Sequence, residues 1–433
     1  MKDENTNSTE KEENTNSTGD GPPETDATVQ PLPPVGADEL LAIECGKLML
    51  APNILDDGAS LVREMGVAGE DALVRLLYLV MTSRILDSPV SLAIKGESSG
   101  GKSFTLKTVL KLFPDSAYVL HASVSPMYIV RGEEPYEHRM LVFEEFAGVN
   151  RSTEYFLRIL LSEGYVSHRT LVGQSNDLEP KTFSKPGPTG LVLTTTAISI
   201  HRENETRMLS VSITDTPEQT RNALVAMAKS YEKIGTVNVE AHRQFQEWMS
   251  HQPNKVAIPY LDRLAQLIAP VAMRVRRDFK AVVSLIRTHA LLHRANRRTD
   301  EAGYIVATKA DYIAVYDLMA ELVSHGVDAS VPSNVRETVE AVQGLLAEYP
   351  EGVPNNVLAA ALGLHEGTAS RRGKAAIARG YLVNESGSSG KESRLMLGAS
   401  MPIDSAVLPH PDEIAADDCT VAPDFGHTGT NEG

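Results

Sequence analysis

Gly96-Glu-Ser-Ser-Gly-Gly-Lys-Ser103 follows a short β-rich run, 90–95, and precedes a helical pattern over 104–113. This order matches the P-loop, in which backbone N–H groups of a glycine-rich turn surround phosphate oxygens. In such a loop Lys102 reaches the β- and γ-phosphates of ATP, and Ser103 binds Mg²⁺. The residues expected to hold the nucleotide are Gly96, Glu97, Ser98, Ser99, Gly100, Gly101, Lys102 and Ser103.

Two further apolar runs, 140–143 and 190–194, are predicted to be buried strands, and a helical pattern over 153–162 lies between them. Strands that alternate with helices indicate a parallel sheet covered on both faces. The sequence therefore predicts the α/β fold class.

Glu144 and Glu145 directly follow the first of these strands. At a strand end beside the phosphates, one carboxylate can organise Mg²⁺ and another can polarise the attacking water. We expect Ser103 and Glu144 to be the metal ligands, and both glutamates are candidates for catalysis. A solvated acidic turn is the alternative interpretation.

Hydroxyl groups lie at the end of the second strand, in Leu191-Val-Leu-Thr-Thr-Thr196. Thr195 is the candidate to orient water or to sense the γ-phosphate, although threonine is also a common strand residue. Arg207 comes next along the chain. It is expected either to reach a neighbouring subunit's nucleotide as an arginine finger or to form a salt bridge with Glu203 or Glu205.

These motifs, in this order, resemble the Walker A, Walker B, sensor 1 and arginine finger of AAA+ ATPases. The likeness is greatest to minichromosome-maintenance and superfamily 3 helicases, and to helicase- or primase-associated ATPases of bacterial mobile elements, over roughly residues 50–400. It implies a P-loop AAA+ core, hydrolysis of ATP with Mg²⁺ and a homo-oligomeric ring. Glu144 stands where aspartate is usual in the family.

Residues 164–181 alternate apolar and polar side chains around a polar tip, which predicts a β-hairpin. In the helicases that the chain resembles, a hairpin at this place lines the channel and grips DNA. The resemblance implies DNA contacts from His168, Arg169 and Lys181, whereas a purely structural hairpin is the alternative.

Three short helical patterns follow Val335, and two β-rich runs, 380–384 and 393–397, flank a Gly/Ser-rich turn. This succession is typical of a winged helix-turn-helix. The helix after Gly363 has small polar and basic residues, which suit the major groove and its phosphates. Its candidate DNA contacts are Thr368, Ser370, Arg371, Arg372 and Lys374; a protein partner is the alternative.

The net charge of the 433-residue chain is −16, and most of it lies near the two ends. Of 57 acidic and 41 basic residues, 8 and 2 fall within 1–36, and 7 and none within 402–433, so the remainder carries a charge of about −3. DNA is therefore a compatible partner. Two cysteines exclude a disulfide framework, and the absence of a long apolar run argues against a membrane protein, so we expect a cytoplasmic location.

The predicted domains are a disordered acidic tail over 1–36, a helical subdomain over 37–89, a P-loop ATPase core over 90–235, a helical lid over 236–330, a winged helix over 331–400 and a second disordered acidic tail over 401–433. The leading interpretation is a ring-forming ATPase that translocates on DNA as a helicase. The alternative is an ATP-gated DNA-binding regulator that does not unwind DNA. A small-molecule kinase is disfavoured because no acceptor-site motif accompanies the P-loop.

Overall fold

The computed structural model describes residues 45–97, 101–122, 125–146, 151–174, 177–196, 207–213, 216–232, 237–269, 274–330, 333–385, 393–399 and 407–414. The predicted tail 1–36 and most of 401–433 lie outside this part of the chain. Within it, none of the helices combines the length and apolar character needed to cross a membrane.

A parallel five-stranded sheet forms the centre of the molecule, with the strand order β2-β3-β6-β1-β7. The α/β fold class is thereby confirmed. The strands are β1 (Leu92–Lys95), β2 (Tyr118–His121), β3 (Arg139–Phe143), β6 (Thr189–Thr195) and β7 (Leu209–Ser212). The sequence predicted β1, β3 and β6 but missed β2 and β7. These two lie at the edges of the sheet, where partly exposed residues interrupt the apolar run.

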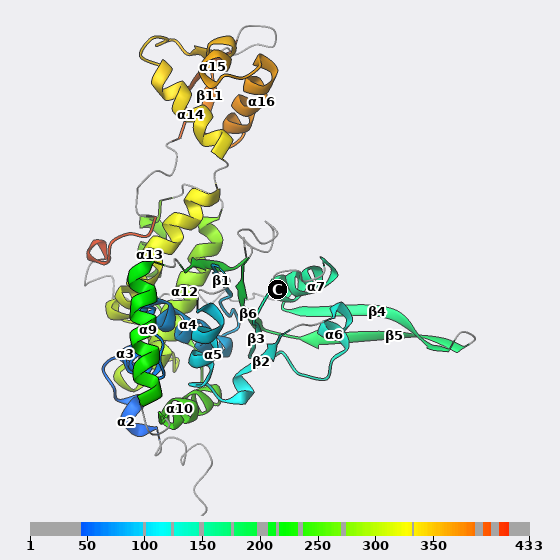
Figure 1. The fold of residues 1–433 in the computed structure, drawn as a ribbon, viewed down its shortest axis with the longest axis vertical. Coiled ribbons are helices and arrows are strands. Elements are labelled where there is room, and N and C mark those ends of the chain that lie inside the picture. Colours follow the sequence, from blue (N-terminus) through cyan, green and yellow to red (C-terminus); the bar gives the residue numbers. More distant parts are fainter. Residues whose placement is uncertain are drawn as a thin grey trace, which may run out of the picture.

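Two hydrophobic cores lie on the two faces of this sheet, because alternate strand residues point to opposite sides. Leu92 and Val192 belong to the first core, with helices α4 (Asp71–Thr82), α5 (Lys102–Leu110) and α12 (Val275–Leu292). Ala93 and Leu193 belong to the second core, with α6 (Pro126–Arg131) and α7 (Arg151–Glu163). Figure 1 shows the sheet between these two layers of helices.

The helices before β1 share the first core with four of the helices after β7. The former are α2 (Gly46–Met49), α3 (Ile54–Glu64), α4 and η1 (Ser83–Ile85), and the latter are α10 (Glu240–Ser250), α11 (Leu261–Leu267), α12 and α13 (Lys309–Ser330). The buried guanidinium of Arg84 joins the two groups, donating to the Gln246 side chain at 2.8 Å and to its carbonyl at 2.9 Å. The predicted subdomain 37–89 and lid 236–330 therefore do not have separate cores.

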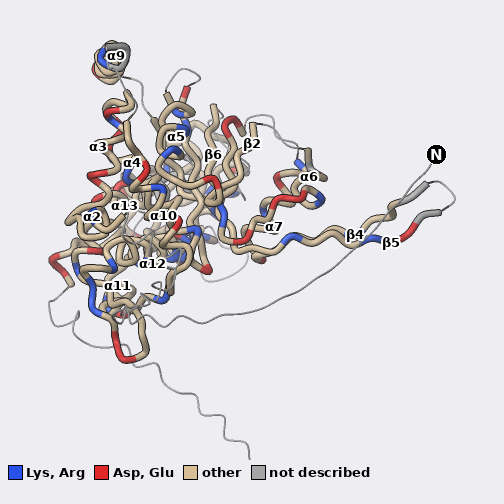
Figure 2. The backbone as a smooth tube through the Cα atoms, turned by 90° about the horizontal axis from the view of Figure 1, so that it is seen from below, with Lys and Arg blue, Asp and Glu red and all other residues tan. Residues whose placement is uncertain are grey.

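The predicted all-helical lid contains a short parallel strand pair, β8 (Val256–Ala257) and β9 (Ile305–Val306). Strands of two residues are too short to show an alternating pattern, so the sequence could not indicate them. Short 3₁₀ turns, η2 (Asp115–Ala117) and η3 (Arg294–Asn296), connect other elements. Helix α9 (Pro217–Glu232) stands off the body in Figure 2, and the Gln219 side chain links its first turn to the Ala68 carbonyl at 3.3 Å.

The predicted hairpin is confirmed and is longer than expected. It consists of β4 (Tyr165–Gln174) and β5 (Asp177–Pro186), paired antiparallel over ten residue pairs. Figures 1 and 2 both show it projecting far beyond the sheet. Its base packs against α7 and α6, since Val166 is buried in the second core.

The C-terminal unit has its own core and lies apart from the body in Figure 1. It contains α14 (Ser333–Leu345), α15 (Asn355–Leu362), α16 (Glu366–Ile377) and an antiparallel sheet of β10 (Val353–Pro354), β12 (Arg394–Leu397) and β11 (Leu382–Asn384), in that order. Gly363 ends α15 in the left-handed conformation, with φ of 63°. The expected helices followed by antiparallel strands are thus present.

After this unit the chain returns to the body as a segment that we call the C-terminal strap, residues 407–414, which includes η4 (Pro411–Glu413). Val407, Leu408 and Ile414 are buried in the first core, and the Tyr312 hydroxyl on α13 donates to the Pro409 carbonyl at 2.6 Å. The prediction of a disordered tail over 401–433 is therefore wrong for the strap. The three buried apolar residues of the strap lie among prolines and acidic residues, so the composition of this segment did not indicate that it is ordered.

Candidate functional site

The glycine-rich loop 96–103, which the sequence predicts to bind phosphate, begins where β1 ends, and two of its glycines have unusual backbone conformations. Gly96 has φ of 155° and Gly101 has φ of 73°, conformations that other residues rarely adopt. A Cβ atom at Gly96 would lie 3.0 Å from the Ile213 carbonyl, whereas one at Gly101 would have no atom of another described residue within 4 Å. Ser98, Ser99 and Gly100 lie outside the described residues.

Lys102 is the first residue of α5, and Gly101 is its N-cap. The lysine is only 4% exposed, and its Nζ donates to the carbonyl of Gly96 at 2.8 Å and to that of Glu97. The ammonium group thus lies inside the loop. Together with the first N–H groups of the helix, it provides the positive potential that an anion needs at this place.

The helix α5 and the strands β3 and β6 meet at the carboxyl ends of the strands, through contacts of Ser103, Glu144 and Thr194. The Ser103 Oγ lies 3.4 Å from the Glu144 carbonyl and 3.5 Å from the Thr194 Oγ1. The Thr194 hydroxyl also donates to the Glu144 carbonyl. The structure therefore places Ser103 beside the acidic strand end, as a metal site would require.

Thr194, rather than the predicted Thr195, is the threonine that meets Ser103. Val192 belongs to the first core and Leu193 to the second, so Thr194 continues the α5 side of β6 and Thr195 the opposite side. Thr195 is 1% exposed, and its carbonyl accepts from the Gly96 amide at 3.3 Å. Strand alternation was the signal that could have separated the two threonines.

The two glutamates have different surroundings. Glu144 is partly buried, and its Oε1 lies 2.9 Å from Nζ of Lys107 on α5, a residue that the sequence did not single out. Glu145 is exposed, and its Oε1 accepts from the Thr196 amide at 3.4 Å. Glu144 thus lies towards α5 and Ser103, whereas Glu145 lies towards the end of β6.

Arg207 lies at the amino ends of the sheet strands, whereas the glycine-rich loop lies at their carboxyl ends. It precedes β7, where Leu209 pairs with Leu92 at the start of β1, so it is separated from Gly96 by roughly 15–20 Å at ~3.3 Å per strand residue. Its two predicted partners, Glu203 and Glu205, lie outside the described residues. Arg207 therefore lies far from the glycine-rich loop of its own chain.

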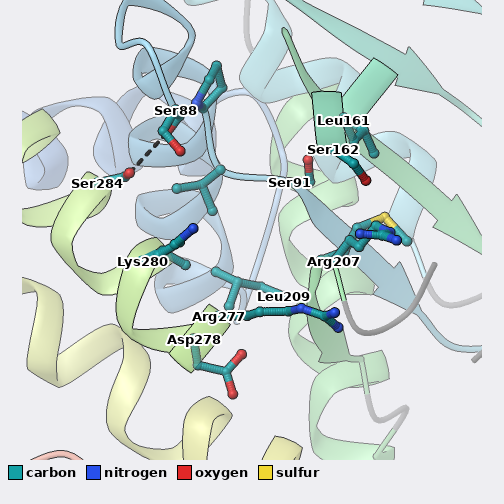
Figure 3. A pocket seen from close by; sticks show the side chains of 14 residues that line it. Ser88, Ser91, Leu161, Ser162, Arg207, Leu209, Arg277, Asp278, Lys280 and Ser284 are labelled. Atoms are coloured by element: carbon teal, nitrogen blue, oxygen red, sulfur yellow. Dashed lines mark hydrogen bonds between the residues drawn. The ribbon is translucent and has the colours of Figure 1, made fainter. Parts of the chain in front are cut away.

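Arg207 lines a pocket of about 300 Å³ at the amino ends of the strands, and Figure 3 shows Arg277 and Lys280 of α12 on its wall. Asp278 also lines it, but its carboxylate is paired with Arg274, whose Nε lies 3.2 Å away. Burial raises the pKa of Asp278, and the charge of Arg274 opposes this shift. Among the described residues that line the pocket, Arg207, Arg277 and Lys280 are basic and Asp278 is acidic, and the Asp278 carboxylate is paired with Arg274.

The three hairpin candidates do not share one face. His168 pairs with Phe183 and lies edge-on to Phe156 of α7, with ring centroids 5.6 Å apart. Lys181 lies on this same face, 5.1 Å from the Phe183 ring centroid. Arg169 lies on the other face, where its Nε donates to the Thr182 hydroxyl at 3.3 Å. Lys181 and Arg169 are exposed, and His168 is half-buried.

The five candidates on α16 also differ in accessibility. Arg371 and Lys374 are exposed one turn apart, whereas Thr368 and Ser370 are half-buried. Arg372 points back to α14, where its Nη1 lies 2.9 Å from Glu337 Oε2. Arg371 and Lys374 are thus the two basic candidates that this helix presents to solvent.

No model of a known protein family matches this chain, and no curated protein matches it significantly.

Proposed function

We propose that the chain is an ATP hydrolase of the AAA+ type that acts on DNA as a translocase or helicase. One observation carries this proposal: a P-loop lysine and serine, an acidic strand end and a strand-end threonine converge at one edge of a parallel sheet. Ligands of α/β sheets bind beyond the carboxyl ends of the strands, which is where this convergence occurs.

The residues of this edge fit Mg²⁺ and ATP. Gly101, with its positive φ, and the inward ammonium of Lys102 suit the phosphates, and Ser103 with Glu144 suits a cation that phosphate and water otherwise coordinate. A bound Mg²⁺ would neutralise charge on the phosphates. Glu145 is exposed at the end of β3, where a carboxylate suits activation of water, and the Thr194 hydroxyl holds the Glu144 carbonyl beside Ser103.

The C-terminal unit supports DNA as the partner. Three helices and a three-stranded antiparallel sheet with its own core match the arrangement of a winged helix. Its α16 presents Arg371 and Lys374 outwards, and the projecting hairpin adds Arg169 and Lys181. In this proposal α16 enters the major groove, and the hairpin contacts the backbone of DNA during translocation.

An ATP-gated DNA-binding regulator is the second candidate. The observation that favours it is the separate core of the C-terminal unit, which allows DNA binding by a body distinct from the nucleotide site. In that case nucleotide controls assembly or DNA binding, and no strand is displaced.

Two assays on the full chain separate these candidates: ATP hydrolysis with and without DNA, and strand displacement with ATP and Mg²⁺. If the chain is a helicase, we expect DNA-stimulated hydrolysis and strand displacement. If it is a regulator, we expect hydrolysis without strand displacement. Lys102→Ala is the control, because it removes the ammonium from the P-loop and should abolish nucleotide binding in a folded protein. Equal ATP affinity in folded Lys102→Ala protein would contradict the nucleotide site itself.

A further inference from the structure

Lys107 stands one helical turn after Ser103 on α5, so both residues face the end of β3. The Glu144 residue between them is engaged twice. Its carbonyl oxygen lies 3.4 Å from the Ser103 Oγ, and its carboxylate lies 2.9 Å from the Lys107 Nζ. The carboxylate expected to face a metal beside Ser103 is therefore paired with a cation from the next turn.

The length of Glu144 makes this pair possible. An aspartate at this position would end one methylene group earlier, about 1.5 Å short of the glutamate carboxylate. Glu144 stands where the family that the chain resembles usually has aspartate, and its longer side chain can reach from the end of β3 to Lys107. Lys107 is 52% exposed and Glu144 is 23% exposed, so water reaches both groups and the pair can open without leaving a buried charge.

We propose that Lys107 is a positioning residue that competes with Mg²⁺ for the Glu144 carboxylate. This inference rests on the proposed ATP site. In the nucleotide-free protein Lys107 holds Glu144 one turn away from Ser103; in the loaded protein Glu144 leaves Lys107 and turns to the metal beside Ser103. Lys107 thereby raises the Mg²⁺ concentration at which the nucleotide site fills, and it makes metal loading depend on the phosphates.

The test measures binding of a fluorescent ATP analogue as Mg²⁺ is titrated, with no need for hydrolysis. An exposed ion pair stabilises weakly, so Lys107→Met should lower the Mg²⁺ midpoint by about 2- to 5-fold. Lys107→Arg keeps the pair and should keep the wild-type midpoint. Lys111→Met is the matched control, because this exposed lysine is the C-cap of α5, whereas the described ion pair of Glu144 is with Lys107.

A second background shows whether Lys107 acts through Glu144. In Glu144→Asp protein the shorter carboxylate does not reach Lys107, so adding Lys107→Met should leave the midpoint of that variant unchanged. The same shift in both backgrounds, or an equal shift in Lys111→Met protein, would mean a general charge effect and would overturn the inference. So would a wild-type midpoint in Lys107→Met protein.

Failure of the proposed function has a different signature. Wild-type protein would then bind no ATP analogue at any Mg²⁺ concentration, and Lys102→Ala would change nothing. If wild-type protein binds the analogue and Lys102→Ala protein does not, the nucleotide site is supported. The Mg²⁺ midpoints of the Lys107 variants then test only whether Lys107 competes with the metal.

Discussion

Thr194 and Thr195 are adjacent in the chain, but only the first meets the P-loop helix. Thr194→Val removes the hydroxyl that holds the Glu144 carbonyl beside Ser103, and a small misplacement at such a site is costly. We expect its steady-state ATP turnover to fall roughly 10- to 100-fold. Thr195→Val is the matched control and should keep turnover within about 2-fold. Equal losses in both variants would return the sensing role to Thr195.

Glu144 and Glu145 should fail in different ways. Glu145→Gln retains the metal-side carboxylate and loses the group that polarises water, so it should bind ATP normally while turnover falls by roughly 10²- to 10⁴-fold. Glu144→Gln should instead require more Mg²⁺ for nucleotide binding. Bound-nucleotide and phosphate-release measurements distinguish the two, and full turnover in both variants would remove this strand end from the active site.

The candidate residues that the sequence could indicate are those that belong to local motifs. Gly96, Lys102, Ser103 and the acidic pair stand in short patterns whose chemistry can be read without a fold. Thr194 and Lys107 could not be chosen this way. Their roles depend on which side of β6 the helix α5 covers and on which helical turn lies opposite Glu144.

At the scale of elements, α16 offers two adjacent arginines with different surroundings. Arg371 is exposed, and Arg372 is paired with Glu337. Arg371→Gln should weaken DNA binding and reduce the slope of log affinity against log salt by about 1. Arg372→Gln should leave that slope unchanged. Salt-dependent titrations with duplex DNA measure both, and an unchanged slope in Arg371→Gln protein would favour a protein partner for this helix.

The elements that the sequence predicted well are those with long, regular patterns. The central strands β1, β3 and β6 are buried runs, and the hairpin alternates over many residues. The strands β2 and β7 were missed because edge strands contain partly exposed residues, which interrupt the apolar run. The β8–β9 pair was missed because each strand has two residues. Which helices share a core depends on contacts such as Arg84 with Gln246, which no local pattern reveals.

For the whole molecule, the decisive question is whether Arg207 acts on a neighbouring subunit. In the proposed ring it would act on a neighbour's nucleotide, because it lies at the amino ends of the strands, away from the glycine-rich loop of its own subunit, and it lines a pocket together with Arg277 and Lys280. We expect ATP turnover per subunit to rise with protein concentration. Arg207→Ala should lower turnover by about 10³-fold or more at any concentration.

Mixing two inactive variants tests this arrangement directly. Lys102→Ala protein has an intact Arg207, and Arg207→Ala protein has an intact P-loop, so some mixed interfaces contain both groups. Part of the activity should return on mixing. If the two variants demonstrably co-assemble and no activity returns, or if Arg207→Ala protein hydrolyses ATP normally, an intrachain salt bridge becomes the better interpretation of Arg207.

The C-terminal strap makes the C-terminal unit an insertion rather than an appendage, because the chain leaves the body at α13 and comes back to pack against the same helix. A stop codon after residue 399 would therefore remove Val407, Leu408 and Ile414 from the first core, at a cost of several kcal/mol by the ~1.5–3 kcal/mol expected for each buried aliphatic side chain. A stop codon after Ile414 should leave the melting temperature unchanged.

A single protease nick between the two bodies should likewise leave both fragments together on a sizing column. A truncated protein that lacks the unit thus needs a linker from α13 to residue 407, so that the strap stays in place.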